Sequence, residues 1–380
     1  KRGKNLGQSK HIDKKDFTRS QRHRHSVDDL SSLLFGSRPF AGYTVSSSPF
    51  SLGLYCVPLL FFQICVGIFA FISGYGLYLS FSKQPNTAKS ASAWTVSRTI
   101  KTMSGYWFIY ILALISTWIY ADLPIKTYCT DGNIRGAFYA FLDFLGLASL
   151  FKTPTLNTTW WYMGAAILFI ALVPCFTRLA KKIGYVPLII LIVMLPRLLK
   201  VGYPGSINPY GFLLALLFGM LFAQYNLFTR MAQFQPLQNK TLWAVVRFLF
   251  WLCALVICYL VCSRVERYQA WELHYAVAPL IFILFCKRYV VRIPVIQQLL
   301  CFFGKHSLNI FLIHTFIRFN FFTDFIYSFR YFWLITLVLF GISLGISIVL
   351  EWIKKGIRFD IFTHWLCTKT EKAVNQISNK

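Results

Sequence analysis

Acidic residues are scarce in this chain. Its 380 residues include 13 Asp and Glu against 39 Lys and Arg, and only 14% of all positions are charged. A soluble domain of this length needs many more charged groups to cover its surface, so this composition excludes a soluble protein. Apolar residues reach 56% and fall into repeated blocks of roughly 17–25 residues, the length that crosses a hydrocarbon core as a helix. The sequence therefore predicts an all-α, polytopic transmembrane helical bundle.

The chain also lacks a cysteine pattern that would bind a metal ion or build a disulfide framework. Most of the ten cysteines lie inside apolar runs, and they form no C-x-x-C pair and no cluster with histidine. Buried in such runs, cysteines behave as small hydrophobic residues. We therefore expect no metal site and no bound cofactor.

The net charge of +26 admits two interpretations. In a soluble protein it would indicate nucleic-acid binding, but no basic stretch outside the apolar segments is interleaved with stacking aromatic residues. In a polytopic chain the excess follows the positive-inside rule, which keeps Lys and Arg on the cytoplasmic side. We expect no nucleic-acid partner and assign the basic loops to the cytoplasm.

About ten apolar segments follow residue 50, and roughly nine to ten spans are expected. The segment 137–150 is short and interrupted by Asp143 and Gly146, which predicts a re-entrant or interfacial helix. If that segment does not cross the membrane, all the basic loops lie on the cytoplasmic side, and the C-terminus is cytoplasmic as well. The segments are approximately 56–81, 104–121, 137–150, 159–177, 186–199, 209–225, 242–262, 273–286, 306–323 and 331–352.

The chain divides into a basic N-terminal segment (1–50), a membrane domain (51–353) and a basic cytoplasmic tail (354–380). One span is missing from this arrangement. The span 56–81 must enter from outside to reach the basic loop at Lys83, whereas the residues before it are strongly basic and should be cytoplasmic. The intervening stretch is too polar to cross.

Four blocks resemble, in order, the signature motifs of the acyltransferase-3 membrane family. Residues 64–76 resemble its second-span signature, and Arg98-Thr-Ile-Lys101 is similar to its basic element before the third span. Residues 153–162 resemble its Trp-rich block, and residues 304–314 its C-terminal G-x-x-S…H signature. The resemblance runs from about residue 35 to residue 352.

This resemblance implies an integral membrane O-acyltransferase of the bacterial plasma membrane. The donor would be acyl-CoA, with acetyl-CoA the expected form, and the acceptor a hydroxyl of a cell-surface or lipid-linked polysaccharide. Membrane lipid and the glycan are thus the expected partners. Two alternatives stay open: a transporter or exporter of a glycan precursor, which would also place polar residues inside spans, and an inactive product of a damaged acyltransferase gene.

The family's first span, with a Lys-Gly-Ile-Ala-like start and a His-His end, is absent where the topology lacks a span. With one choice of synonymous codons, residues 21–34 read one base later give K-G-I-A-I-L-L-M-I-F-H-H-F-F. We hypothesise that residues from about 20 to 34 are a frameshifted translation of that span. The resemblance makes its His the catalytic base or acyl relay, a role suited to a pKa near neutrality. The catalytic residue of the chain as written is therefore unknown.

Several charged residues lie near the predicted span ends. Arg98 and Lys101 are expected to bind the phosphates of acyl-CoA, because fixed cations recognise phosphate oxygens. Ordinary anchoring at the cytoplasmic interface is the alternative, and Lys lacks the planar fork of the family's second Arg. Glu351 and Arg197 are expected to snorkel or to pair.

Polar and aromatic residues of the apolar segments are candidates for lining the active site. Ser73 and Tyr75 flank Gly74 in one segment, where small residues also permit close helix packing. Trp160 and Trp161 could stack on a sugar, or form an aromatic belt at the outer interface.

Two histidines of the last signature complete the candidate site. His314 follows His306 by eight residues, so both can face the same side of a helix. An ionisable group inside a span is a functional candidate, and a neutral His bonded to a neighbouring helix is the alternative. Ser307 and Asn309 are expected to cap or brace the start of that helix.

Overall fold

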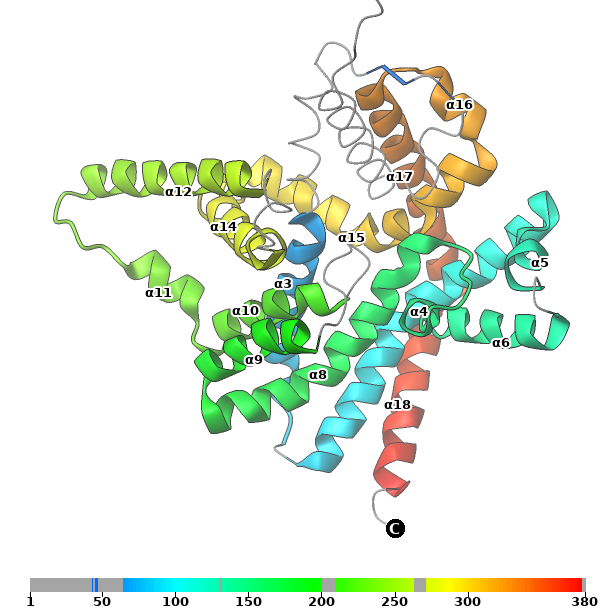
Figure 1. The fold of residues 1–380 in the computed structure, drawn as a ribbon, viewed down its shortest axis with the longest axis horizontal. Coiled ribbons are helices and arrows are strands. Elements are labelled where there is room, and N and C mark those ends of the chain that lie inside the picture. Colours follow the sequence, from blue (N-terminus) through cyan, green and yellow to red (C-terminus); the bar gives the residue numbers. More distant parts are fainter. Residues whose placement is uncertain are drawn as a thin grey trace, which may run out of the picture.

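The computed structural model describes residues 43, 45–46, 64–85, 87–129, 132–199, 209–262 and 271–377. These residues form helices (Figure 1), and the β pairing recorded among them is one isolated bridge between Ser46 and Tyr331. The predicted all-α, polytopic bundle is confirmed.

The elements keep the labels of Figure 1. They are α3 (Ile64–Phe81), α4 (Ala88–Ala121), α5 (Leu123–Tyr128), α6 (Asn133–Phe144), α7 (Ala148–Phe151), the 3₁₀-helix η3 (Thr158–Trp160), α8 (Trp161–Ile183), α9 (Tyr185–Leu198), the 3₁₀-helix η4 (Pro209–Phe212), α10 (Leu213–Gln224), α11 (Leu227–Gln233), α12 (Lys240–Cys262), the π-helix η5 (Leu273–Val277), α14 (Ala278–Phe285), the π-helix η6 (Cys286–Val290), α15 (Pro294–Phe316), the π-helix η7 (Ile317–Phe321), α16 (Thr323–Ser328), α17 (Phe332–Gly356) and α18 (Phe359–Ile377).

Seven helices of the described part are long and apolar enough to cross a membrane. An eighth span results if η4 and α10 form one bent span with α11, and α9 is a shorter apolar helix of 14 residues. The described part of the chain thus holds seven or eight candidate spans, whereas nine to ten were predicted for the whole chain. The hypothesis of a frameshifted first span concerns residues about 20–34, which lie outside the described residues.

The segment predicted not to cross is broken as expected. Gly146, with φ of 72°, separates α6 from α7, because a left-handed residue cannot continue an α-helix. Neither piece is among the helices long enough to span. In Figure 1, α6 lies crosswise to α18.

Backbone-to-backbone contact joins α3 to α10. A Cβ atom added at Gly74 would overlap the carbonyl oxygen of Leu216, and one added at Gly219 would overlap that of Phe71. Only glycine permits this approach, so the close-packing role predicted for the small residues of this segment is confirmed at Gly74.

The charged residues near span ends are paired. The guanidinium of Arg197 donates to both carboxylate oxygens of Glu272, with 2.8 Å between Nη2 and Oε2. Glu351 accepts a hydrogen bond from Lys354 at 2.9 Å. Of the two outcomes expected for Arg197 and Glu351, the structure shows pairing.

The stretch interpreted as a basic tail is largely helical. α17 continues to Gly356, and α18 lies alongside α4 in Figure 1. The rings of Phe359 and Phe108 lie 5.4 Å apart, and the Cys367 thiol donates to the Ser97 carbonyl at 3.6 Å. Polar side chains between the apolar residues of α18 lower its hydropathy, so apolar runs alone gave no helix here.

Candidate active site

Five polar side chains form a hydrogen-bonded network between α15 and α17. His306 Nδ1 lies 2.9 Å from the Ser347 hydroxyl, which also accepts from the Asn309 amide at 3.1 Å. That amide donates to Glu351 at 2.8 Å, and its oxygen accepts from Lys354 at 3.0 Å. His306, Asn309 and Ser347 are buried. The network places a carboxylate, an ammonium group and an imidazole within the bundle.

The amide of Asn309 is what connects the network. It donates to the Glu351 carboxylate and accepts from the Lys354 ammonium group, and a side-chain amide can do both at once. Hydrogen bonds to charged groups contribute about 1.5–3 kcal/mol each. Asn309 therefore fixes α15 to α17 at a defined register.

The Trp-rich block meets α15 about one turn further along. The Trp160 indole donates to the Leu312 carbonyl at 3.0 Å, and the Thr159 and Thr315 hydroxyls are 3.5 Å apart. Trp160 is only 2% exposed and packs on Tyr106, with the ring centres 5.1 Å apart. The Trp160 ring is therefore not open to lipid or to a sugar in this structure, and its role in lining the active site stays a prediction.

His314 is held in one orientation by its own helix. Its Nδ1 lies 2.9 Å from the Phe311 carbonyl oxygen and 3.1 Å from that of Ile310. A carbonyl oxygen only accepts, so Nδ1 carries the proton of the neutral ring and Nε2 keeps a lone pair. Nε2 lies 3.3 Å from the Thr315 hydroxyl. His314 thus presents a proton acceptor beside the Trp-rich block.

Other predicted residues are only partly brought together. Ser73 of α3 lies close enough to Tyr162 of α8 to act on its hydroxyl, and the Tyr162 ring lies 5.9 Å from Phe311, one turn before His314. Tyr75 instead packs on Phe228, with ring centres 5.5 Å apart. Ser73 therefore neighbours the site, whereas the Tyr75 ring contacts α11.

Trp161 is half-buried, and its ring lies 5.8 Å from Phe212 and 5.9 Å from Tyr162. It retains an accessible part that the preceding Trp160 lacks.

Arg98 and Lys101 lie on the first half of α4. Lys101 is exposed, Arg98 is half-buried, and the buried Arg98 Nε has no hydrogen-bond partner. Phe108, two turns beyond Lys101, lies under the Lys354 ammonium group at 5.5 Å. The two cations are thus on the helix that contacts the network.

The expectation that Ser307 and Asn309 cap a helix start is wrong. α15 begins at Pro294, a residue type favoured in the first turn, so both positions are in the helix interior. Ser307 donates to the Gly304 carbonyl at 2.9 Å, and Asn309 bonds to α17.

The sequence did not lead us to expect that Asp143 is a buried acceptor of several hydrogen bonds. It is 1% exposed, and its carboxylate accepts from the Tyr128 hydroxyl at 2.6 Å, the Leu156 N–H at 2.9 Å and the Thr155 hydroxyl at 2.9 Å. The Tyr106 hydroxyl donates to its backbone carbonyl at 2.6 Å. Burial raises the pKa of the Asp143 carboxyl, opposed by these bonds. The sequence signal that could have indicated this role is a single acidic residue inside an apolar segment.

His274 was also missed. It lies in η5 and is 2% exposed, and neither ring nitrogen has a hydrogen-bond partner. Its ring contacts Tyr275, with centres 5.1 Å apart.

A small apolar cavity of about 150 Å³ adjoins the network. Helices α4, α15, η7 and α17 line it, with Ala113 from α4, Ile313 from α15 and Leu350 from α17 among the side chains. Leu350 directly precedes Glu351, and Ile313 directly precedes His314. An acyl chain is a chemically suitable occupant of such a space.

Buried ionisable groups bonded between apolar spans define an integral membrane protein with a polar site inside its bundle. Comparison with known families matches residues 35–352 to the acyltransferase-3 family, described as an acyltransferase domain. The chain belongs to this family and is a membrane acyltransferase. Comparison with curated proteins and with solved structures gives no match. No group of three or more potential metal ligands occurs among the described residues.

Proposed function

We propose that the chain transfers an acyl group, acetyl being the expected one, from acyl-CoA to a hydroxyl of a cell-surface or lipid-linked polysaccharide. The family match supports acyl transfer. The observation that carries the proposal is His314, whose Nδ1 is held by carbonyl oxygens while the basic Nε2 faces the Thr315 hydroxyl beside the Trp-rich block, where a substrate hydroxyl would take the place of Thr315.

The reaction needs a base at the acceptor. The base takes the proton of the sugar hydroxyl, the hydroxyl oxygen attacks the thioester carbonyl, and the C–S bond breaks to release the CoA thiolate. The protonated base then returns its proton to that thiolate, so protons and electrons balance. The resemblance assigns this role to the His of the first span; among the described residues, His314 Nε2 has the suitable geometry.

The proposed orientation follows the charges. The basic start of α4 and the end of α17 are cytoplasmic by the positive-inside rule, which places the Trp-rich block toward the outer side of the bacterial plasma membrane. Arg98 and Lys101 would then bind the CoA phosphates on the cytoplasmic side. The apolar cavity lined by Ala113 and Ile313 would hold the acyl chain.

The test uses the full chain in lipid nanodiscs with radiolabelled acetyl-CoA and isolated envelope glycan. Transfer of label to the glycan with release of CoA is the expected result. His314→Gln should lower the rate about 10²–10⁴-fold, whereas His364→Gln, at an exposed position of α18, should leave it unchanged.

Two outcomes contradict the proposal. Equal rates for His314→Gln and the parent chain would remove His314 from the chemistry. Counterflow of labelled glycan without acylation would favour the transporter.

A further inference from the structure

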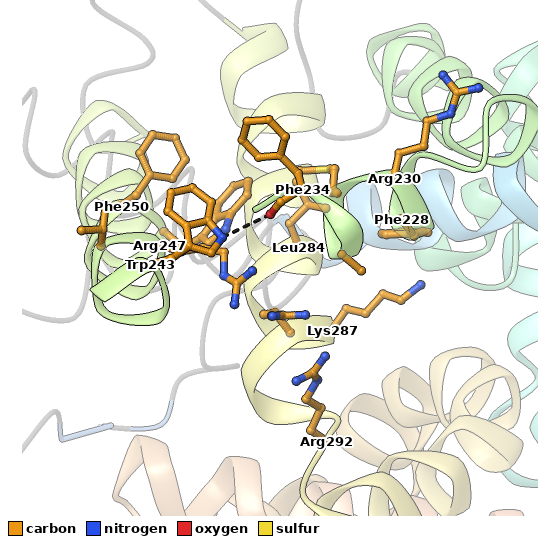
Figure 2. A pocket seen from close by; sticks show the side chains of 14 residues that line it. Phe228, Arg230, Phe234, Trp243, Arg247, Phe250, Leu284, Lys287 and Arg292 are labelled. Atoms are coloured by element: carbon orange, nitrogen blue, oxygen red, sulfur yellow. Dashed lines mark hydrogen bonds between the residues drawn. The ribbon is translucent and has the colours of Figure 1, made fainter. Parts of the chain in front are cut away.

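A cavity of about 700 Å³ lies away from the candidate active site. It lies between α11, α12 and the continuous α14–η6 helix (Figure 2). Its described lining residues are Phe228, Arg230, Met231, Ala232, Phe234, Trp243, Val246, Arg247, Phe250, Trp251, Leu284, Lys287, Arg288 and Arg292.

The lining carries five cations, and none of its described residues is acidic. In Figure 2 the side chain of Arg247 reaches into the space from α12 and that of Arg292 from the turn after η6, whereas Arg230 points away from its centre. Arg288 lies close enough to both Arg247 and Arg292 for their like charges to repel. The cavity lining therefore gathers positive charge around Arg288.

Nothing in the described part of the chain neutralises this charge. The ion pairs found there join Arg197 to Glu272 and Lys354 to Glu351, and neither involves a cavity residue. The Nε of Arg247 is buried and has no hydrogen-bond partner. Like charges in a partly buried space cost free energy unless an anion accompanies them. The cavity has the charge of an anion-binding site.

The chemistry of the cations narrows the class of anion. Guanidinium groups present planar pairs of N–H donors that match the oxygens of phosphate, and three of the five cations converge as guanidinium groups. A phosphate among Arg247, Arg288 and Arg292 would accept from the unpartnered Arg247 Nε and offset the repulsion.

The remaining walls are apolar. The Trp243 indole donates to the Phe234 carbonyl at 3.2 Å, and the two rings pack edge to face with centres 6.0 Å apart. Lys287 lies 3.5 Å from the centre of the Phe228 ring. No residue of the apolar window of α12 is buried inside the bundle, so this wall continues directly into the lipid-facing surface. A bound molecule can therefore extend from the cations into the hydrocarbon.

We propose that this cavity binds the phosphate headgroup of an anionic membrane lipid. The phosphate lies among Arg247, Arg288 and Arg292, and the acyl chains run along the aromatic rings and the exposed face of α12. A soluble polyphosphate would satisfy the cations equally, but it would leave the apolar wall uncovered. The site does not depend on acyl transfer.

The test compares lipid binding by the full chain and a triple variant, Arg247→Gln with Arg288→Gln and Arg292→Gln. Each protein is exchanged into a mixture of phosphatidylglycerol and phosphatidylcholine, and bound lipid is counted by native mass spectrometry. The parent chain should prefer phosphatidylglycerol at least about tenfold, a difference of about 1.4 kcal/mol, and the variant should lose this preference.

A matched control removes the same charge elsewhere: Lys181→Gln with Lys182→Gln and Lys355→Gln, all at exposed positions. It should keep the preference. The single variant Arg292→Glu, at an exposed helix boundary, tests the site in case the triple variant does not fold, and should also lose most of the preference.

Three results would overturn the proposal. The first is an unchanged preference in both cavity variants, and the second is an equal loss in the control. The third is displacement of phosphatidylglycerol from the parent chain by CoA at micromolar concentration, which would make the cavity a site for soluble phosphates.

Discussion

Replacing the Asp143 carboxylate tests how the Trp-rich block is held in place. Three donors converge on the two carboxylate oxygens: the Tyr128 hydroxyl, the Thr155 hydroxyl and the Leu156 N–H. Asp143→Leu has a similar shape but leaves the Tyr128 hydroxyl and the Leu156 N–H without this acceptor, whereas Thr155 keeps a second acceptor. Each unsatisfied buried group costs about 1–3 kcal/mol, so we expect a loss of roughly 2–6 kcal/mol in the free energy of unfolding.

Asp143→Asn should cost less. The amide oxygen can still accept from Tyr128 and Leu156, and the Thr155 hydroxyl can turn to its second acceptor, the Asn157 carbonyl at 3.2 Å. The extra strength that the charge gives these two bonds is lost, but the larger cost of burying the charge, which raises the pKa of Asp143, is lost with it, so the change should stay within about 1 kcal/mol. Thr155→Val removes one donor and also the acceptor of the buried Asn157 N–H, so it should cost about 1–3 kcal/mol.

The assay is unfolding of the detergent-solubilised chain, followed by circular dichroism at several pH values. Because the pKa of Asp143 is raised in the folded state, the folded chain binds more protons than the unfolded one between the ordinary value of 3.8 and the raised value. The contribution of this group to stability therefore falls as pH rises through that window, and Asp143→Asn should lack that dependence. An Asp143→Leu variant as stable as Asp143→Asn would refute this reasoning.

Three further substitutions probe packing and polar contacts, each followed by thermal unfolding. Gly74→Ala should destabilise by about 3 kcal/mol or more, because its Cβ overlaps the Leu216 carbonyl, whereas Gly76→Ala, with open space around it, should stay within about 0.5 kcal/mol; similar losses at both sites would contradict the contact. His274→Leu should stabilise by about 1–3 kcal/mol, since neither ring nitrogen is bonded, and a loss of stability would show that the ring has a partner. Asn309→Leu should cost about 2–4 kcal/mol by leaving Glu351 and Lys354 without their bridge, and a neutral result would show the network to be dispensable.

Much of the fold could be predicted from composition and short patterns. Apolar runs gave the helical class, and Asp143 with Gly146 correctly marked the segment that does not cross. The start of α15 was misplaced because Lys305 and the glutamines before it lower the local hydropathy, although Pro294 was a usable start signal.

The site was harder to predict because it depends on contacts between distant segments. A tryptophan near a span end has the same local sequence whether it faces lipid or packs on Tyr106, so only the tertiary structure separates Trp160 from Trp161. The partners of Asn309 lie about 40 residues away on α17, beyond any local pattern. The roles of Arg98 and Lys101 in donor binding stay predictions.

The contact of α3 with α10 also limits how the bundle can move. Where Gly74 and Gly219 bring two backbones together, no layer of side chains is left that could change rotamer and let the helices slide. The pair must therefore shift as one body during any working cycle. Movements between helices are instead expected where long side chains make the contact, as between Lys354 and Asn309. Rotation about the single bonds of the Lys354 side chain allows this contact to persist over a range of helix separations.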